Sequence, residues 1–300
     1  MRRSLLFLPG NQPGMLQSGG VLPADTLIFD LEDSVAAGEK DAARELVASA
    51  LRSFDFGRRE LSARINDLET KHAFTDLKTL IPAGIETIML PKVSGGDMVQ
   101  QVAALFDEIE LEHGIVKGRI KIIALIETAC GVEHAYEVAV ASPRVVALAL
   151  GAEDLAADLG CARTKEGREI FYSRSRLIIA AKAAGIEALD TPFTDARDTE
   201  GCYEDALFAR SLGYAGKLCI SPHHLDSIHR AFMPSKAEIE FALEVTEAMR
   251  RAKEDKRGAV SLRGKMIDLP VLLQAERTLH LARAAGLIQE EPDGENNHEA

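Results

Sequence analysis

Two apolar runs near the middle of the chain most strongly limit how it can fold. Residues 122–126 and 145–150 are apolar throughout, without alternating polar positions. Continuous apolar runs of this length are typical of strands that are covered on both faces of a parallel sheet. A helix-like segment at 132–141 separates them, and neighbouring parallel strands require a crossover of this kind.

An acid follows each of the two runs. Glu127 comes directly after the first, and Glu153 and Asp154 come shortly after the second. Because parallel strands end at the same edge of a sheet, we expect these carboxylates to lie close together. Two such carboxylates can bind a hard divalent cation such as Mg²⁺. The alternative is that the acids only cap the helices that follow them.

Six more short strand-like runs surround this pair. They lie at 4–8, 26–30, 61–66, 86–90, 186–190 and 217–220. Helical patterns alternate with the runs, at 39–53, 72–80, 97–113, 132–141, 173–184 and 201–212. Eight strands alternating with helices predict an α/β fold, a (β/α)₈ TIM barrel, and such barrels routinely use a length of 300 residues as one domain. An open doubly wound sheet is less favoured, because no G-x-G-x-x-G follows the first strand.

Polar residues gather where the predicted strands end, which is where barrel enzymes place their active sites. In chain order these ends carry Pro9-Gly10, Asp30 to Asp33, Arg64 with Asn66, Pro91-Lys92, Glu127, Glu153-Asp154, Asp190 and Ser221-Pro222. Charge or an amide at most of the eight ends indicates a functional site at this face of the barrel.

A C-terminal extension follows the last predicted strand. An amphipathic helix is expected at 235–255, with Ser235 and Glu238 as a capping box, and a second helix at 271–285. We therefore predict a barrel at 1–233, a helical lid or oligomerisation arm at 234–288, and a disordered acidic tail at 289–300.

The composition excludes several kinds of partner. The formal net charge of −12 argues against a nucleic acid or an anionic membrane surface. No apolar run approaches the roughly 20 residues of a membrane span. The four cysteines form no C-x-x-C, which favours reduced thiols and a cytoplasmic location over a disulfide framework or a zinc site.

The residues at the strand ends suggest particular chemistry. Two carboxylates with Mg²⁺ would bind an oxo- or hydroxy-acid and stabilise an enolate. Arg64 could grip a substrate carboxylate, form a salt bridge to the acids at 30–33, or do both. Lys92 could instead form a Schiff base in a metal-free aldolase, but the acids around it disfavour an activated neutral lysine. Neither G-x-S-x-G nor H-E-x-x-H occurs, so hydrolase and zinc-protease functions have little support.

These motifs together resemble the citrate lyase β-subunit family of the HpcH/HpaI aldolase superfamily, which includes malyl-CoA and citramalyl-CoA lyases. The resemblance covers residues 2–285. Its motifs are the segments at 3–10 and 30–35, Lys40 with Arg44, and the segments at 64–66, 90–93, 126–129, 151–155 and 216–217.

The resemblance implies a Mg²⁺-dependent barrel that cleaves or forms a carbon–carbon bond in a β-hydroxyacyl thioester. Glu127 and Asp154 would be the metal ligands, and Arg64 would clamp the 2-oxo acid. The substrate would also contact Pro91 and Lys92. Asp30, Glu32 and Asp33 would hold metal-bound waters, and Lys40 and Arg44 match positions that touch the phosphates of CoA.

The segment at 264–270 resembles the lid motif of the CoA lyases. By that resemblance, Asp268 would act as an acid/base group in the active site of an adjacent subunit, and the enzyme would be a homo-oligomer, often a trimer.

Two departures from the family pattern leave the acyl carrier open. Ser221 replaces a histidine that the family places after the eighth strand, and 12–18 holds no basic residue. The lid motif favours a free-standing citramalyl-CoA or malyl-CoA lyase. The alternatives are a citryl-carrier-protein lyase subunit, which needs an acyl carrier protein, and a barrel that binds CoA esters or oxo acids without turnover.

Overall fold

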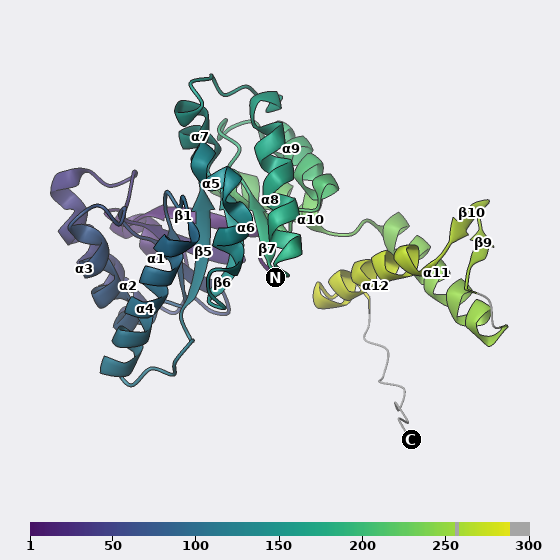
Figure 1. Cartoon of the computed structure of the whole chain (residues 1–300), viewed down its shortest axis with the longest axis horizontal. Helices are drawn as coiled ribbons and strands as arrows, with labels where there is room; N and C mark the ends of the chain where they lie inside the picture. Colours follow the sequence, from purple (N-terminus) through teal and green to yellow (C-terminus); the bar gives the residue numbers. More distant parts are fainter. Residues whose placement is uncertain (256–257, 289–300) are drawn as a thin grey trace. The chain divides into compact units, whose positions relative to one another are not determined.

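The computed structural model describes residues 1–255 and 258–288 and divides the chain into two compact units (Figure 1). The first unit comprises Met1–Phe232, and the second begins at Met233. The tail predicted at 289–300 lies outside the described residues.

The first unit is a closed barrel of eight parallel strands, as the sequence predicts. Each strand pairs with the next along the chain, and β8 closes on β1. The strands are β1 (Ser4–Pro9), β2 (Thr26–Asp30), β3 (Glu60–Arg64), β4 (Thr87–Leu90), β5 (Lys121–Ile126), β6 (Val145–Leu150), β7 (Glu187–Asp190) and β8 (Gly216–Cys219).

Helices separate the strands of the barrel along the chain, and one more follows the last strand. They are α1 (Pro13–Ser18), α2 (Lys40–Ser53), α3 (His72–Ala83), α4 (Gly96–Glu112), α5 (Ala129–Glu133), α6 (Ala135–Val140), α7 (Ala152–Asp158), α8 (Phe171–Ala183), α9 (Thr199–Leu212) and α10 (Leu225–Phe232). Among the described residues of both units, no helix is long and apolar enough to cross a membrane.

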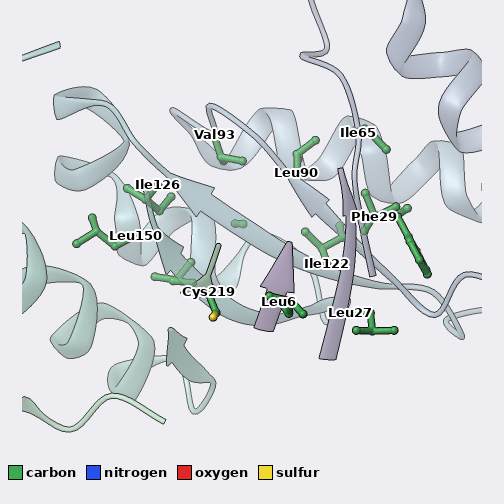
Figure 2. Close-up of a cluster of buried hydrophobic side chains, with 14 of the residues drawn as sticks. Leu6, Leu27, Phe29, Ile65, Leu90, Val93, Ile122, Ile126, Leu150 and Cys219 are labelled. Carbon is green, nitrogen blue, oxygen red and sulfur yellow. The ribbon is translucent and has the colours of Figure 1, made fainter. Parts of the chain in front are cut away.

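Successive strand residues enter two different cores, which explains why the two central runs are apolar throughout. One cluster comprises alternate residues such as Leu5, Ile123 and Leu189, and it fills the inside of the barrel. The other lies between the strands and the helices. Figure 2 shows part of this outer cluster, with Leu6, Leu27, Phe29, Ile65, Leu90, Val93, Ile122, Ile126, Leu150 and Cys219.

The helices differ from the sequence prediction in three places. The segment expected as one helix at 132–141 is two short helices that meet at His134. Helix α7 is absent from the predicted helical patterns, and only the alternative in which Glu153 and Asp154 cap a following helix anticipates it. Helix α10 after the eighth strand was also missed, because only a turn was expected there.

The second unit has a small apolar core of its own. Helix α11 (Lys236–Glu254) begins with the predicted capping box, in which Ser235 and Glu238 bond each other's backbone N–H groups. A two-stranded antiparallel hairpin, β9 (Val260–Leu262) and β10 (Lys265–Ile267), leads to α12 (Leu269–Ala284). The role of this second unit as a lid or oligomerisation arm stays a prediction.

Candidate active site

A cavity of about 470 Å³ opens at the carboxyl ends of the barrel strands. Residues from or directly after seven of the eight strands line it. They include Phe7, Pro9, Asp30, Asp33, Ser34, Arg64, Leu125, Glu127, Gly151, Asp154, Thr191, Leu218 and Ile220. The sequence analysis predicted a site at this face because parallel strands end at the same side of a barrel. In the structure, Arg64, Glu127 and Asp154 all line this cavity.

Glu127 is buried at the end of β5, with 1% of its surface exposed. One carboxylate oxygen, Oε1, accepts a hydrogen bond of 2.8 Å from the backbone N–H of Lys92. Burial, together with the nearby charges of Glu32 and Asp154, raises the pKa of Glu127 to about 8. Such a carboxylate is stabilised in its ionised form by a cation placed beside it.

Asp154 and Glu153 follow the next strand but have different surroundings. Both lie in the first turn of α7 and line the cavity. Glu153 forms an ion pair of 3.1 Å with Arg163, whereas the charge of Asp154 acts on Glu127. The arrangement is therefore compatible with Glu127 and Asp154 as the two predicted metal ligands.

Arg64, at the end of β3, is held by the acids that follow β2. Its Nε and one terminal nitrogen each donate a hydrogen bond of 2.7 Å to the carboxylate of Asp30. The other terminal nitrogen lies 3.2 Å from oxygens of both Glu32 and Asp33. The guanidinium also lies over the ring of Phe7, at 5.0 Å. The salt bridge considered for Arg64 is thus present, and the same side chain still lines the cavity.

Glu32 is a buried carboxylate with incomplete hydrogen bonding. Its side chain is ion-paired with Arg64 at 3.2 Å and with Lys92 at 3.0 Å. Neither contact has the alignment of a hydrogen bond, and both oxygens lack a hydrogen-bond partner. Burial raises the pKa of Glu32 despite the two cations. Unsatisfied buried oxygens at this place are suited to bind water or a cation.

Lys92 follows buried Pro91 at the end of β4, and neither residue lines the cavity. Burial lowers the pKa of the lysine, but the close, negatively charged carboxylate of Glu32 outweighs this effect, so the pKa is raised overall. A Schiff base requires a neutral amine. The geometry therefore gives no support to the metal-free aldolase alternative.

Lys40 and Arg44 lie on α2 and are engaged by the protein itself. The ammonium of Lys40 donates to the backbone carbonyl of Leu31 at 2.8 Å. Arg44 is 4% exposed, and its guanidinium donates to Asp76 at 2.7 Å and to Asp41 at 2.9 Å. Their predicted contacts with the phosphates of CoA stay a prediction.

The charges around the cavity suit a divalent cation. When all of these groups are ionised, five carboxylates exceed three cationic side chains by two charges: Asp30, Glu32, Asp33, Glu127 and Asp154 against Lys40, Arg64 and Lys92. Among the described residues, no three acidic, histidine or cysteine side chains form a ready-made metal cage. Mg²⁺ needs none, because it binds one or two carboxylates and keeps waters or substrate oxygens.

Three of the polar residues that the sequence places at strand ends do not line the cavity. Asp190 is fully buried, bonded to Arg174 at 2.9 Å and Lys217 at 2.6 Å, and does not line the cavity. Asn66 donates to Asp76 at 2.7 Å and does not line it either. Ser221 is buried, with its hydroxyl 3.4 Å from the carbonyl of Ala196.

Asp268 belongs to the second unit, where it caps α12. Its Oδ1 accepts a bond of 3.4 Å from the backbone N–H of Val271. Its predicted place in the active site of an adjacent subunit stays a prediction.

A parallel barrel whose strand ends present paired carboxylates and an anchored arginine defines a class of metal-assisted enzymes that act on anionic substrates. The profile of the HpcH/HpaI aldolase/citrate lyase family matches residues 3–222. The chain belongs to this family, and the predicted enzyme class, a carbon–carbon lyase, is confirmed.

Several curated relatives match nearly the whole chain. The citrate lyase subunit beta of Leuconostoc mesenteroides subsp. cremoris is 40% identical over 97% of this chain and 96% of its own length. The L-malyl-CoA/beta-methylmalyl-CoA lyase of Rhodobacter capsulatus is 35% identical, over 95% of this chain and 96% of its own length.

Among solved structures, protein CitE from Mycobacterium tuberculosis in complex with magnesium, acetoacetate and coenzyme A is 33% identical. The similarity has a TM-score of 0.78 and covers 93% of this chain and 97% of the other.

Proposed function

We propose that this chain is a Mg²⁺-dependent lyase that cleaves a β-hydroxyacyl thioester and releases a 2-oxo acid. The observation that carries the proposal is the convergence of Glu127, Asp154 and Arg64 on one cavity. Solved relatives are complexes with magnesium and small oxo acids, namely acetoacetate, pyruvate and oxaloacetate.

Each group has a distinct part in the proposed reaction. Glu127 and Asp154 would hold Mg²⁺, and the bound metal would supply Lewis-acid stabilisation of the oxo acid. Arg64, fixed by Asp30, neutralises and orients the acid group of the substrate. Asp30 thereby sets the direction of the guanidinium before substrate arrives, which reduces the entropy lost on binding.

The bond changes are those of a retro-Claisen cleavage. A base takes the proton of the substrate hydroxyl, whose oxygen becomes the carbonyl of the 2-oxo acid. The carbon–carbon bond breaks, and its electron pair passes to the thioester enolate. A proton from Asp268 of a neighbouring subunit then completes the acyl thioester.

For the acyl carrier, the first candidate is a carrier protein, with the chain as the β subunit of a citrate lyase that acts on a citryl thioester. The identity of 40% to a citrate lyase subunit beta supports this candidate. The presence of a C-terminal unit does not separate the candidates, because the same alignment covers 97% of this chain and therefore extends into that unit.

The second candidate is a free-standing lyase of malyl-CoA or citramalyl-CoA. The R. capsulatus lyase supports it at 35% identity, as does a citramalyl-CoA lyase of mouse at 31%. A cytoplasmic location and a homo-oligomeric state are parts of both candidates.

One experiment tests the function and separates the candidates. Purified protein is given citryl-carrier protein, citryl-CoA, malyl-CoA or citramalyl-CoA, with Mg²⁺ or with EDTA, and the released oxo acid is identified. We expect Mg²⁺-dependent oxaloacetate from the citryl carrier protein. Glyoxylate or pyruvate from a CoA ester would favour the second candidate. Binding of oxo acids with no turnover of any thioester would leave the non-catalytic barrel.

A further inference from the structure

Lys92 has a backbone conformation that is costly for a lysine. Its φ of 52° lies in the left-handed region, and Arg263 is the only other non-glycine residue with positive φ among the described residues. Glycine adopts this conformation at lower cost, by about 1 kcal/mol. Arg263 lies with Gly264 between the two strands of a hairpin, where such angles are usual. A side chain kept at Lys92 despite this cost indicates a use for the side chain.

The two ends of Lys92 contact two different carboxylates. Its backbone N–H donates to Oε1 of Glu127 at 2.8 Å. Its ammonium lies 3.0 Å from Oε1 of Glu32 and 3.9 Å from Asp67. The next residue, Val93, bonds back to Leu125 of β5 at 3.2 Å, so the unusual conformation is confined to this one position.

Glu32 is therefore shared between two cations. One of its oxygens faces Lys92 at 3.0 Å, and the other faces the terminal nitrogen of Arg64 at 3.2 Å. That nitrogen also lies 3.2 Å from Asp33, whereas the opposite edge of the guanidinium is held by Asp30 at 2.7 Å. The longer contacts mark the edge of Arg64 that an incoming carboxylate can take.

We propose that Lys92 is a positioning residue for the 2-oxo acid. By neutralising Glu32, the Lys92 ammonium frees one edge of the Arg64 guanidinium. Without the ammonium, Arg64 would be the one cation of the described residues still ion-paired with the buried carboxylate of Glu32, and the guanidinium edge would be drawn to it. The site would also gain one net negative charge, which repels an anionic ligand. This inference rests on the proposed function, because it requires an anionic oxo acid in the cavity.

The test compares Lys92→Met, Lys92→Gly and Lys92→Arg in the full-length protein. Binding of pyruvate and oxaloacetate is measured by calorimetry in saturating Mg²⁺, and binding of Mn²⁺ is measured without any acid. We expect Lys92→Met to weaken oxo-acid binding roughly tenfold and to leave the Mn²⁺ affinity equal or higher, since one positive charge is removed. Lys92→Arg should restore most of the oxo-acid affinity.

Lys92→Gly separates the side chain from the backbone. Glycine keeps the N–H that Glu127 accepts and adopts the positive φ freely, so the thermal midpoint should not fall. Oxo-acid binding should nevertheless weaken as in Lys92→Met. Lys117→Met, which removes an exposed lysine paired with Asp107, is the control for loss of one charge.

Two results would overturn the inference while the proposed function stands. One is wild-type oxo-acid affinity in both Lys92→Met and Lys92→Gly. The other is a parallel loss of Mn²⁺ and oxo-acid binding, which would show that Lys92 only holds the site together. If the wild-type protein binds no oxo acid in Mg²⁺, the proposed function itself fails, and the inference fails with it.

Discussion

The carboxylate of Glu127 rests directly against the backbone of Gly151. A β-carbon at Gly151 would lie 2.4 Å from Oε2 of Glu127 and 2.7 Å from its Cβ. Oε1 is held from another side by the N–H of Lys92. The glycine at the end of β6 therefore allows the predicted metal ligand on β5 to take its place.

Gly151→Ala should displace Glu127 and weaken Mg²⁺ binding about 10- to 100-fold, the range seen when groups that orient metal ligands are removed. Calorimetric titration with Mg²⁺ measures the change. Gly38→Ala is the matched control, because a β-carbon at Gly38 meets nothing within 4 Å. Wild-type Mg²⁺ affinity in Gly151→Ala would show that Glu127 does not bind the metal.

Asp154→Asn should weaken Mg²⁺ binding by more than about 100-fold, because a ligand contributes more than the groups that orient it, and lyase activity should be lost with it. Glu153→Gln removes the adjacent carboxylate, which is paired with Arg163, and should leave both properties near wild type. Metal titration and product assays on the two variants make the comparison. Equal losses in both would mean that the general negative charge of this turn matters, and not a specific ligand.

The barrel could be predicted from the sequence because buried strands have a recognisable local pattern of apolar residues. Buried strands that contribute to two cores are apolar at most positions, and each of the eight is short and followed by a helix or turn. The position of the site followed from topology alone, since parallel strands place their ends together. The candidate metal ligands also follow strands in the sequence, so their neighbourhood could be inferred.

Contacts between distant residues could not be predicted in the same way. The pairing of Arg44 with Asp76 joins residues 32 positions apart and depends on how α2 packs beside α3. Asp190 is the last residue of its strand and Glu127 directly follows its own, yet the side chain of Asp190 pairs with Arg174 and Lys217 away from the cavity. Strand-end position identifies candidates, but only side-chain direction decides which of them reach the site.

Gly151 and Phe7 were also missed as site residues. The signal for Gly151 was present, because a glycine directly after a buried strand often allows close approach of another group. Phe7 gave no such signal, since it reads as one more apolar residue of β1, although its ring lies under the guanidinium of Arg64.

The free energy of unfolding should fall as the pH drops below about 6.5, and His224 should contribute to this loss of stability. This side chain is 1% exposed, and burial lowers its pKa in the folded protein, with a further lowering from Lys217. The unfolded chain therefore takes up the proton first. The stability gained from neutral His224 is present above the unfolded pKa of about 6.5 and is lost as the pH falls through the lower folded pKa.

Urea unfolding of wild type and His224→Gln at pH values on both sides of this window measures the effect. The difference in unfolding free energy between the two proteins should shrink as the pH falls. His223→Gln alters the exposed neighbour and is the matched control. A difference that stays constant with pH would show that His224 does not titrate on unfolding.

Active sites should be shared between subunits if Asp268 serves the cavity of a neighbour. Glu127→Gln and Asp268→Asn should each be inactive alone. Mixed oligomers should regain about a quarter of wild-type activity, because random pairing places an intact cavity beside an intact Asp268 in one arrangement of four. The two variants are unfolded together and refolded as a mixture, and product formation is measured at each mixing ratio.

The control for this mixture is the pair Glu127→Gln and Asp154→Asn. Both residues line the same cavity of one chain, so no mixed oligomer can restore that site, and activity should stay absent. Recovery in the first pair but not in the second would place Asp268 across a subunit boundary from Glu127. Full activity of Asp268→Asn by itself would remove this residue from the mechanism and leave the second unit with a role in assembly alone.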